Sequence, residues 1–165
     1  MKVTIYLALT ICFALFFGSC DSLKDISAPK LIFRDANIFS STYKNNTVVF
    51  TSHDIKSYNS VSGELIFSDS GTVTKLKNYI SLTCYHDTDS LFSFRLTSNI
   101  MSSIVNDLVL NHNLNNGKYY LNDGYPDWID NIGTTSLRSQ NKLKRAAAWE
   151  VFINQLKLEG KYKDN

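Results

Sequence analysis

Residues 79–97 read YISLTCYHDTDSLFSFRLT, two runs rich in apolar and aromatic side chains separated by a short polar segment. In each run the apolar side chains alternate with polar ones, which is typical of strands buried on one face of a sheet. The segment between them, His86–Ser90, has the composition of a turn. The stretch therefore predicts an antiparallel hairpin formed by Tyr79–His86 and Leu91–Thr97. Its inward side chains are expected to be Ile80, Leu82, Cys84, Phe92, Phe94 and Leu96.

Further strands are predicted on both sides of this hairpin, because short runs of β-branched and aromatic residues alternate with turn residues. Asn116-Gly117 readily supplies the positive φ angles of a tight reversal, so a second hairpin is expected there. The segment Ser52–Asn59 breaks the strand pattern, since Ile55 and Tyr58 stand three residues apart, and it predicts a single helical turn. The other predicted strands are Leu31–Arg34, Thr47–Thr51, Glu64–Ser68, Asp107–His112 and Lys118–Leu121.

The C-terminal quarter of the chain has a helical period instead. Apolar residues recur there at steps of three and four, which predicts one long amphipathic helix. Ser136 or Ser139 is placed to cap its start, and Gly160 to end it in a left-handed conformation. Trp149 is expected to pack against the sheet rather than to serve as a ligand platform. The predicted apolar stripe consists of Leu143, Ala146, Trp149, Ile153 and Leu156.

Together these periods predict an α+β fold, in which an antiparallel β-sheet of about five to seven short strands packs against one long C-terminal α-helix. The chain has 165 residues, which is a usual size for one domain. Residues 30–165 are therefore expected to form a single α+β domain.

Residues 1–19 have the composition of a secretory leader. Lys2 carries a single positive charge, and Val3–Phe17 contain no charged residue. This apolar run is shorter than the roughly 20 residues that span a bilayer, and small residues rather than a basic cluster close it. We therefore expect residues 1–19 to be a signal peptide that is removed from the mature protein.

The leader ends in Phe17-Gly18-Ser19-Cys20, which resembles the lipobox of bacterial lipoproteins, although leucine usually stands where Phe17 does. The resemblance implies that Cys20 becomes the mature N-terminus, with a diacylglycerol on its sulfur and an acyl chain on its amine. Each buried methylene adds about 0.8 kcal/mol of membrane affinity, so these chains form a lasting anchor. The alternative is an ordinary cleaved signal peptide followed by a chance cysteine.

Residues 20–29 are polar and unpatterned, which suits a lipidated tether that keeps the domain close to the membrane. The chain has 17 Lys and Arg against 15 Asp and Glu. Because Lys2 leaves with the leader, the mature protein is nearly neutral, and no nucleic-acid partner is expected. If Cys20 is lipidated, Cys84 lacks a disulfide partner and is expected to be a small core residue. A Cys20–Cys84 disulfide is possible only if Cys20 carries no lipid.

The sequence contains no motif of the common catalytic classes: no Gly-x-Ser-x-Gly elbow, no phosphate-binding glycine loop, no His-Glu-x-x-His and no Cys-x-x-Cys. No catalytic residue, metal ligand or cofactor is therefore predicted. A small hydrolase, directed at glycans or at other substrates, would need a carboxylate pair assembled from distant segments, such as Glu64 with Asp123 or Asp127.

The most unusual stretch is Asn122–Asn131, NDGYPDWIDN, where aromatic residues stand among Asp and Asn side chains. Two interpretations stay open. As a binding site, Tyr125 and Trp128 stack on a sugar ring or a protein partner while Asp123 and Asp127 accept hydrogen bonds. Alternatively, Asp123, Asp127 and Asp130 offer oxygen ligands to Ca²⁺, although their spacing is not that of a known calcium loop. As a structural element, the Asp and Asn side chains satisfy turn backbone and the two rings plug one end of the core. Asp123, Tyr125, Asp127 and Trp128 are the candidate ligand-binding residues.

Three stretches, Asp54–Phe67, Gly117–Pro126 and Ala148–Glu150, resemble the small lipoproteins of Bacteroidetes-type gut bacteria. The resemblance implies an envelope setting and transfers no catalytic residue. It leaves open whether the protein lies in the inner membrane, the outer membrane or at the cell surface. Without a catalytic motif, the sequence favours a lipid-anchored binding or interaction module whose partner is an envelope protein or a glycan.

Changing Cys20 to Ser removes the thiol that lipidation requires. We expect the Cys20→Ser protein to lose acyl labelling and to leave the membrane fraction, because two or three acyl chains supply the lasting membrane affinity. Metabolic labelling with a fatty-acid analogue followed by fractionation measures both effects. Unchanged labelling in the variant would refute the anchor.

Overall fold

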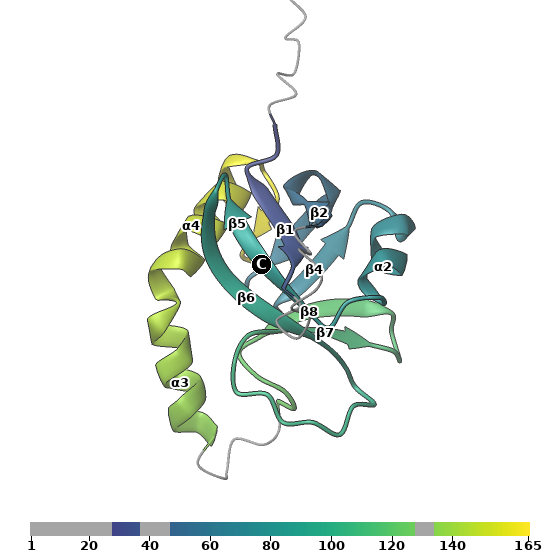
Figure 1. Cartoon of the computed structure of the whole chain (residues 1–165), viewed down its shortest axis with the longest axis vertical. Coiled ribbons are helices and arrows are strands. Elements are labelled where there is room, and N and C mark those ends of the chain that lie inside the picture. The colour runs from purple at the N-terminus through teal and green to yellow at the C-terminus, as the bar shows by residue number, and fades with distance from the viewer. Residues whose placement is uncertain (1–27, 37–46, 128–133) are drawn as a thin grey trace, which may run out of the picture.

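The computed structural model describes residues 28–36, 47–127 and 134–165, and Figure 1 shows a curled sheet flanked by helices. The predicted signal peptide, Cys20, nearly all of the predicted tether, Trp128 and Asp130 lie outside the described residues. The strands are β1 (Leu31–Asp35), β2 (Val48–Thr51), β3 (Ile55–Asn59), β4 (Glu64–Phe67), β5 (Ser81–His86), β6 (Asp89–Ser98), β7 (Val109–Asn113), β8 (Lys118–Asn122) and β9 (Tyr162–Lys163). The helices are a 3-10 turn, η1 (Ser52–Asp54), and the α-helices α2 (Ser70–Leu76), α3 (Thr134–Lys144) and α4 (Ala146–Leu158).

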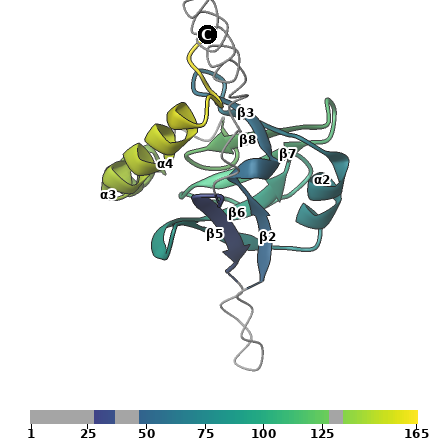
Figure 2. The same ribbon diagram turned by 90° about the horizontal axis from the view of Figure 1, so that it is seen from above.

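The described strands form one nine-stranded sheet in the order β2-β1-β5-β6-β7-β8-β4-β3-β9. The sheet is mixed, because β6 pairs with β7 and β3 with β9 in parallel, whereas the other neighbours are antiparallel. It curls into a half-barrel (Figures 1 and 2). The turn η1 leads from β2, at one edge, directly into β3 near the other edge. The chain itself therefore joins the two ends of the curled sheet.

Both predicted hairpins are confirmed. In the first, β5 and β6 are joined by a turn in which Asp87 has a φ of 53°. In the second, β7 and β8 are joined by a turn that ends at Gly117, with a φ of 71°. Ile80 was wrongly predicted to point inward, because it precedes β5 and is 64% exposed. The buried pairs that face each other across the first hairpin are Leu82 with Phe94 and Cys84 with Phe92.

The core lies between the sheet and α4 and is rich in aromatic rings. Phe33 of β1 stacks on Phe50 of β2, with ring centroids 4.0 Å apart and planes 13° apart. Phe152 of α4 meets Phe33 edge-on, at 6.5 Å and 90°, and is fully buried. Such edge and stacked contacts add to the free energy of burial. The short helix α2 contributes Leu76 to the same core.

The predicted fold class was wrong in three respects. The sheet has nine strands, because β3 and the short β9 were not predicted as strands. It is not purely antiparallel, since the ten residues 99–108 return the chain so that β7 runs parallel to β6. The segment Ser52–Asn59 is a helical turn only at η1, after which it continues as the strand β3. Propensity and periodicity do not report which strands become neighbours, so the pairing could not be predicted from them.

The single long helix was also a wrong prediction, because the helical segment consists of α3 and α4 with an interruption at Arg145. At this residue φ is −94° and ψ is −1°, away from the usual helical values. Ser136 and Ser139 lie inside α3 and do not cap its start, whereas Gly160 has the expected positive φ of 67°. The predicted apolar stripe was wrong at its first residue, since Leu143 is 74% exposed and does not lie on the buried face. The residues of this segment that pack against the core are Ala148, Trp149, Phe152, Ile153 and Leu156, while Arg138 and Arg145 are buried through polar contacts.

Removing the ring of Phe152 tests the core. We expect Phe152→Ala to lower the free energy of unfolding by about 3–5 kcal/mol, because a buried ring is lost and a cavity remains. Leu158→Ala in the same helix is the matched control, since Leu158 is 82% exposed. Urea denaturation followed by circular dichroism measures both, and an equal loss in the two variants would contradict the proposed packing.

Candidate functional site

A cleft of about 480 Å³ lies between the start of α4, the end of β8 and the turn that joins β3 to β4. Its volume falls in the range of roughly 300–1,000 Å³ that is typical of small-molecule sites. The cleft has an aromatic lining and a charged lining. The aromatic residues are Tyr58, Trp149 and Tyr162, and the charged residues are Asp123, Asp127, Lys142 and Arg145.

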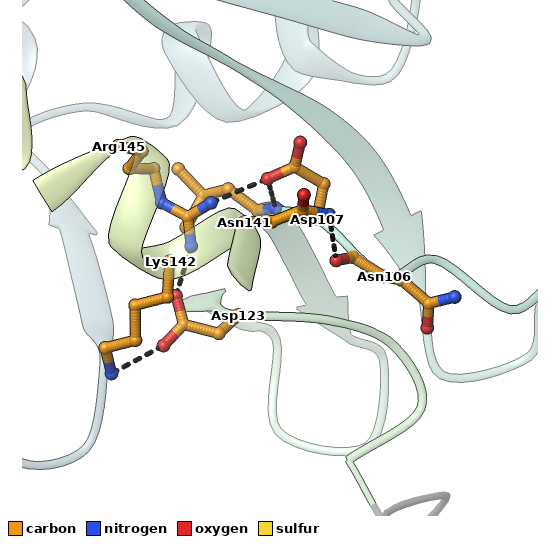
Figure 3. Close-up of polar contacts among 7 residues, drawn as sticks. Asn106, Asp107, Asp123, Asn141, Lys142 and Arg145 are labelled. Carbon is orange, nitrogen blue, oxygen red and sulfur yellow. Dashed lines mark hydrogen bonds and ion pairs between the residues drawn. The ribbon is translucent and has the colours of Figure 1, made fainter. Parts of the chain in front are cut away.

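Arg145 lies at the centre of the charged lining (Figure 3). Its side chain is only 9% exposed and donates through Nη1 to Asp107 Oδ1, at 2.6 Å, and through Nη2 to Asp123 Oδ1. The second oxygen of Asp123, Oδ2, lies 2.8 Å from Lys142 Nζ. Arg145 and Lys142 therefore clamp the Asp123 carboxylate from both of its oxygens. Charge-assisted contacts of this kind are the strongest hydrogen bonds in proteins.

The β7–β8 hairpin brings the two carboxylates together. In its register Val109 lies opposite Asn122, so the residues just before β7 and just after β8 share one end of the hairpin. Asp107 and Asp123 stand at these two positions, and the junction of α3 with α4 crosses the same end (Figure 3). Asn141 Nδ2 adds a bond to the backbone oxygen of Asn106, at 2.9 Å. The antiparallel pairing of β7 with β8 therefore brings together Asp107 and Asp123, which are 16 positions apart in the sequence.

The protonation state of Asp123 follows from these contacts. Burial raises the pKa of Asp123. The hydrogen bonds and charges of Lys142 and Arg145 lower it by more than burial raises it, so the pKa lies below its ordinary value. The carboxylate therefore stays ionised at neutral pH. A general acid needs the opposite shift, so Asp123 is suited to accept hydrogen bonds rather than to donate a proton.

The turn between β3 and β4 forms the exposed rim of the cleft. Asn59 Oδ1 accepts bonds from the backbone N–H groups of Val61 and Ser62, at 3.0 and 2.9 Å. Gly63 has a φ of 72°, and a Cβ added there would lie 2.6 Å from the backbone oxygen of Leu121. Glycine is therefore required at this position, because it lets the turn lie directly on the end of β8.

The aromatic lining combines packing with polar tips. Trp149 lies 5.1 Å from Phe152 between ring centroids, which confirms that it packs in the core, and it is only half-buried where it lines the cleft. Tyr58 meets Trp149 edge-on at 6.0 Å. Burial, followed by the charges of Asp123 and Tyr162, raises the pKa of Tyr58 to about 12. Tyr58 therefore remains protonated at neutral pH.

The predicted loop site is only partly supported by the structure. Asp123 and Asp127 line the cleft, and Asp127 accepts a bond from Asn122 Nδ2 at 3.2 Å. Tyr125 does not line it, because its ring is 7% exposed and its hydroxyl donates to the backbone oxygen of Met101 at 3.1 Å. Tyr125 is thus buried away from the cleft. Trp128 lies outside the described residues, so its role stays a prediction.

Two of the three carboxylates considered for hydrolysis, those of Glu64 and Asp123, are engaged in ion pairs. Glu64 Oε1 lies 2.9 Å from Lys118 Nζ. Asp123 is held by Lys142 and Arg145, as described above. An acid and base pair needs one carboxyl that remains protonated, whereas the pKa of Asp123 is lowered.

Cys84 is a fully buried core residue and forms no disulfide among the described residues. Burial raises the pKa of its thiol well above the ordinary value. The expectation that Cys84 serves as a small core residue is therefore confirmed.

No protein-family model, curated protein or solved structure matches the chain. Within residues 28–36, 47–127 and 134–165, no three or more His, Cys, Asp or Glu side chains are grouped so that they could hold a metal ion. None of the helices in these ranges is both long and apolar enough to cross a bilayer.

Sequence reasoning missed Arg145, Lys142 and Asp107. One signal for Arg145 was present, because it stands four residues before Trp149 and shares the helix face that continues through Phe152. A charged residue on an otherwise apolar face predicts a buried ion pair. The parts of the cleft contributed by Tyr58 and Tyr162 had no local signal, since β3 and β9 meet only in the folded sheet.

Replacing the clamped carboxylate tests the ion-pair network. We expect Asp123→Asn to lower stability at pH 7 by about 1–2 kcal/mol, allowing for solvent screening of a partly exposed group. Because the folded-state pKa of Asp123 is lowered, its contribution is fully present above the unfolded pKa of about 3.9 and is lost as the pH falls through the lower folded value. Urea unfolding at several pH values measures this effect.

The stability difference between wild type and Asp123→Asn should therefore shrink in acid. Asp89→Asn, at an exposed position of the β5–β6 hairpin, is the control and should change stability little at any pH. A difference for Asp123→Asn that is the same at pH 7 and in acid would contradict the assigned pairing.

Proposed function

We propose that the protein is a lipid-anchored component of a bacterial envelope whose folded domain is a noncatalytic binding module. The anchor is the lipid on Cys20, which makes the membrane its first partner. The ligand, an envelope glycan or protein segment, occupies the cleft beside Arg145. The support for the envelope setting is the leader and the lipobox-like Phe17–Cys20.

The observation that carries the binding proposal is the construction of the cleft. Its charged lining is held in place by the clamp of Arg145 and Lys142 on Asp123. Its aromatic lining is held by ring contacts between Trp149, Phe152 and Tyr58. Both linings are thus ordered by contacts within the protein, and a preorganised site loses less entropy when it binds.

The same geometry favours binding over hydrolysis. A hydrolase needs one carboxyl with a raised pKa and a second that is free to act as base or nucleophile. In the cleft the pKa of Asp123 is lowered and both of its oxygens are in ion pairs. We therefore place the hydrolase second and assign no catalytic residue.

Tryptophan quenching provides a direct test of the cleft. The chain has two tryptophans, so Trp128→Phe leaves Trp149 as the sole reporter. The intact protein, purified in a detergent without a sugar headgroup, is screened against neutral oligosaccharides, charged oligosaccharides, peptides and fatty acids. We expect at least one class to raise the melting temperature and to protect Trp149 from quenching by acrylamide, because Trp149 lines the cleft.

A compound that leaves the melting temperature unchanged should not protect Trp149 from acrylamide. Such a compound is the control for nonspecific effects on quenching. If no class protects Trp149 or stabilises the protein, the cleft is not a binding site of this kind and the proposal is wrong.

A further inference from the structure

We propose that the ligand of the cleft is a neutral oligosaccharide, with Trp149 as the platform for one sugar ring and Asp123 and Asp127 as acceptors for its hydroxyl groups. This inference rests on the proposed function and narrows it to one chemical class. The residue that stacks on the sugar is then Trp149, in the first turn of α4, and not Tyr125 or Trp128 as the sequence suggested.

The charges that line the cleft are balanced. Two carboxylates, of Asp123 and Asp127, stand with two cations, of Lys142 and Arg145. The cations are already neutralised, since Arg145 pairs with Asp107 and Asp123 and Lys142 pairs with Asp123. An anionic ligand would have to break one of these pairs, and a cationic ligand would compete with them. An uncharged ligand enters without that electrostatic cost.

These charged groups nevertheless retain hydrogen-bonding capacity for an uncharged polar ligand. A guanidinium has five N–H donors, an ammonium has three, and a carboxylate has about four acceptor positions. The ion pairs of Arg145 and Lys142 use only part of this capacity among the described residues. A sugar hydroxyl both donates and accepts, so it can bridge a neighbouring carboxylate and cation. Adjacent donors and acceptors therefore match a polyhydroxylated ring.

The aromatic lining matches the other face of a sugar. A pyranose ring carries C–H groups on its flat faces, and these pack on aromatic side chains that keep a polar edge in water. Trp149 and Tyr162 are half-buried and line the cleft together. Lys157 Nζ lies 4.8 Å from the centroid of the Tyr162 ring, so one face of that ring is already covered. Trp149 also contacts rings, those of Tyr58, Phe92 and Phe152, at 5.1 to 6.0 Å between centroids. We take Trp149 as the platform because its indole is the larger ring system and its remaining surface lines the cleft.

The rim of the cleft favours a chain over a single sugar. Ser60, Val61 and Ser62 are all exposed, and Val61 is 77% exposed. Asp127, five residues after the end of β8, is exposed as well. The described rim of the cleft is thus exposed at the turn and at Asp127, and a ligand bound at Trp149 can extend past it. A volume of about 480 Å³ accommodates part of such a chain.

Calorimetric titration of the intact protein, in a detergent without a sugar headgroup, tests this inference. The probes are neutral gluco-, xylo-, manno- and N-acetylglucosamine oligosaccharides, matched by sulfated or uronic-acid oligosaccharides and by short peptides. We expect saturable binding of at least one neutral oligosaccharide. Affinity should fall about tenfold or more in Trp149→Phe and in Asp127→Ala, because a platform and an acceptor are lost.

Asp127→Ala keeps the test valid if Trp149→Phe disturbs the core, since Asp127 is exposed. Tyr85→Phe, which alters an aromatic residue that does not line the cleft, is the matched control and should bind as the wild type does. Melting curves of all variants establish that they are folded.

The outcomes separate the two proposals. Binding of neutral oligosaccharides that depends on Trp149 and Asp127 supports the inference. Binding of charged oligosaccharides or peptides alone overturns it while leaving a binding cleft in place. Binding that is lost in Trp128→Phe and kept in Trp149→Phe assigns the ligand to the loop and also overturns it. If no probe of any class binds or protects Trp149, both proposals fail.

Discussion

The structure depends on one buried cation, the guanidinium of Arg145, and on the two carboxylates that neutralise it. Asp107 and Asp123 belong to segments on either side of the β7–β8 hairpin, and Arg145 belongs to the junction of α3 with α4. This contact therefore joins three separate parts of the chain. Removing one carboxylate would leave the poorly solvated guanidinium with a single partner, which lowers stability.

Arg145 separates two parts of the C-terminal helical segment that pack in different ways. Beyond it, α4 packs through Phe152 and Leu156, which are fully buried in the aromatic core. Before it, α3 attaches through polar contacts, such as Arg138 Nη2 with the backbone oxygen of Pro126 at 3.0 Å. The cleft opens where apolar packing gives way to polar packing, which explains why its lining combines aromatic rings with ion pairs.

The same residues thus support the fold and form the proposed site. Asp123 holds Arg145 in place and lines the cleft, and Trp149 packs on Phe152 while its remaining surface faces the ligand space. A site built in this way is already ordered before a ligand arrives, which suits recognition at a membrane surface without a chemical step. The lipid proposed on Cys20 would then hold that site at the envelope.

Local sequence patterns predicted most of the strands and turns, because alternation, turn residues and helical period act over a few neighbouring positions. The two hairpins, all seven predicted strands and the left-handed Gly160 were predictable in this way. Two of the four charged residues that line the candidate site, Asp123 and Asp127, were also found from composition. Three features arise only when distant segments meet in the folded chain: β6 and β7 run parallel, β3 and β9 complete the sheet, and Arg145 lies between Asp107 and Asp123. These features join residues distant in sequence, and their free energy comes from burial and charge pairing that exist only once the chain has folded.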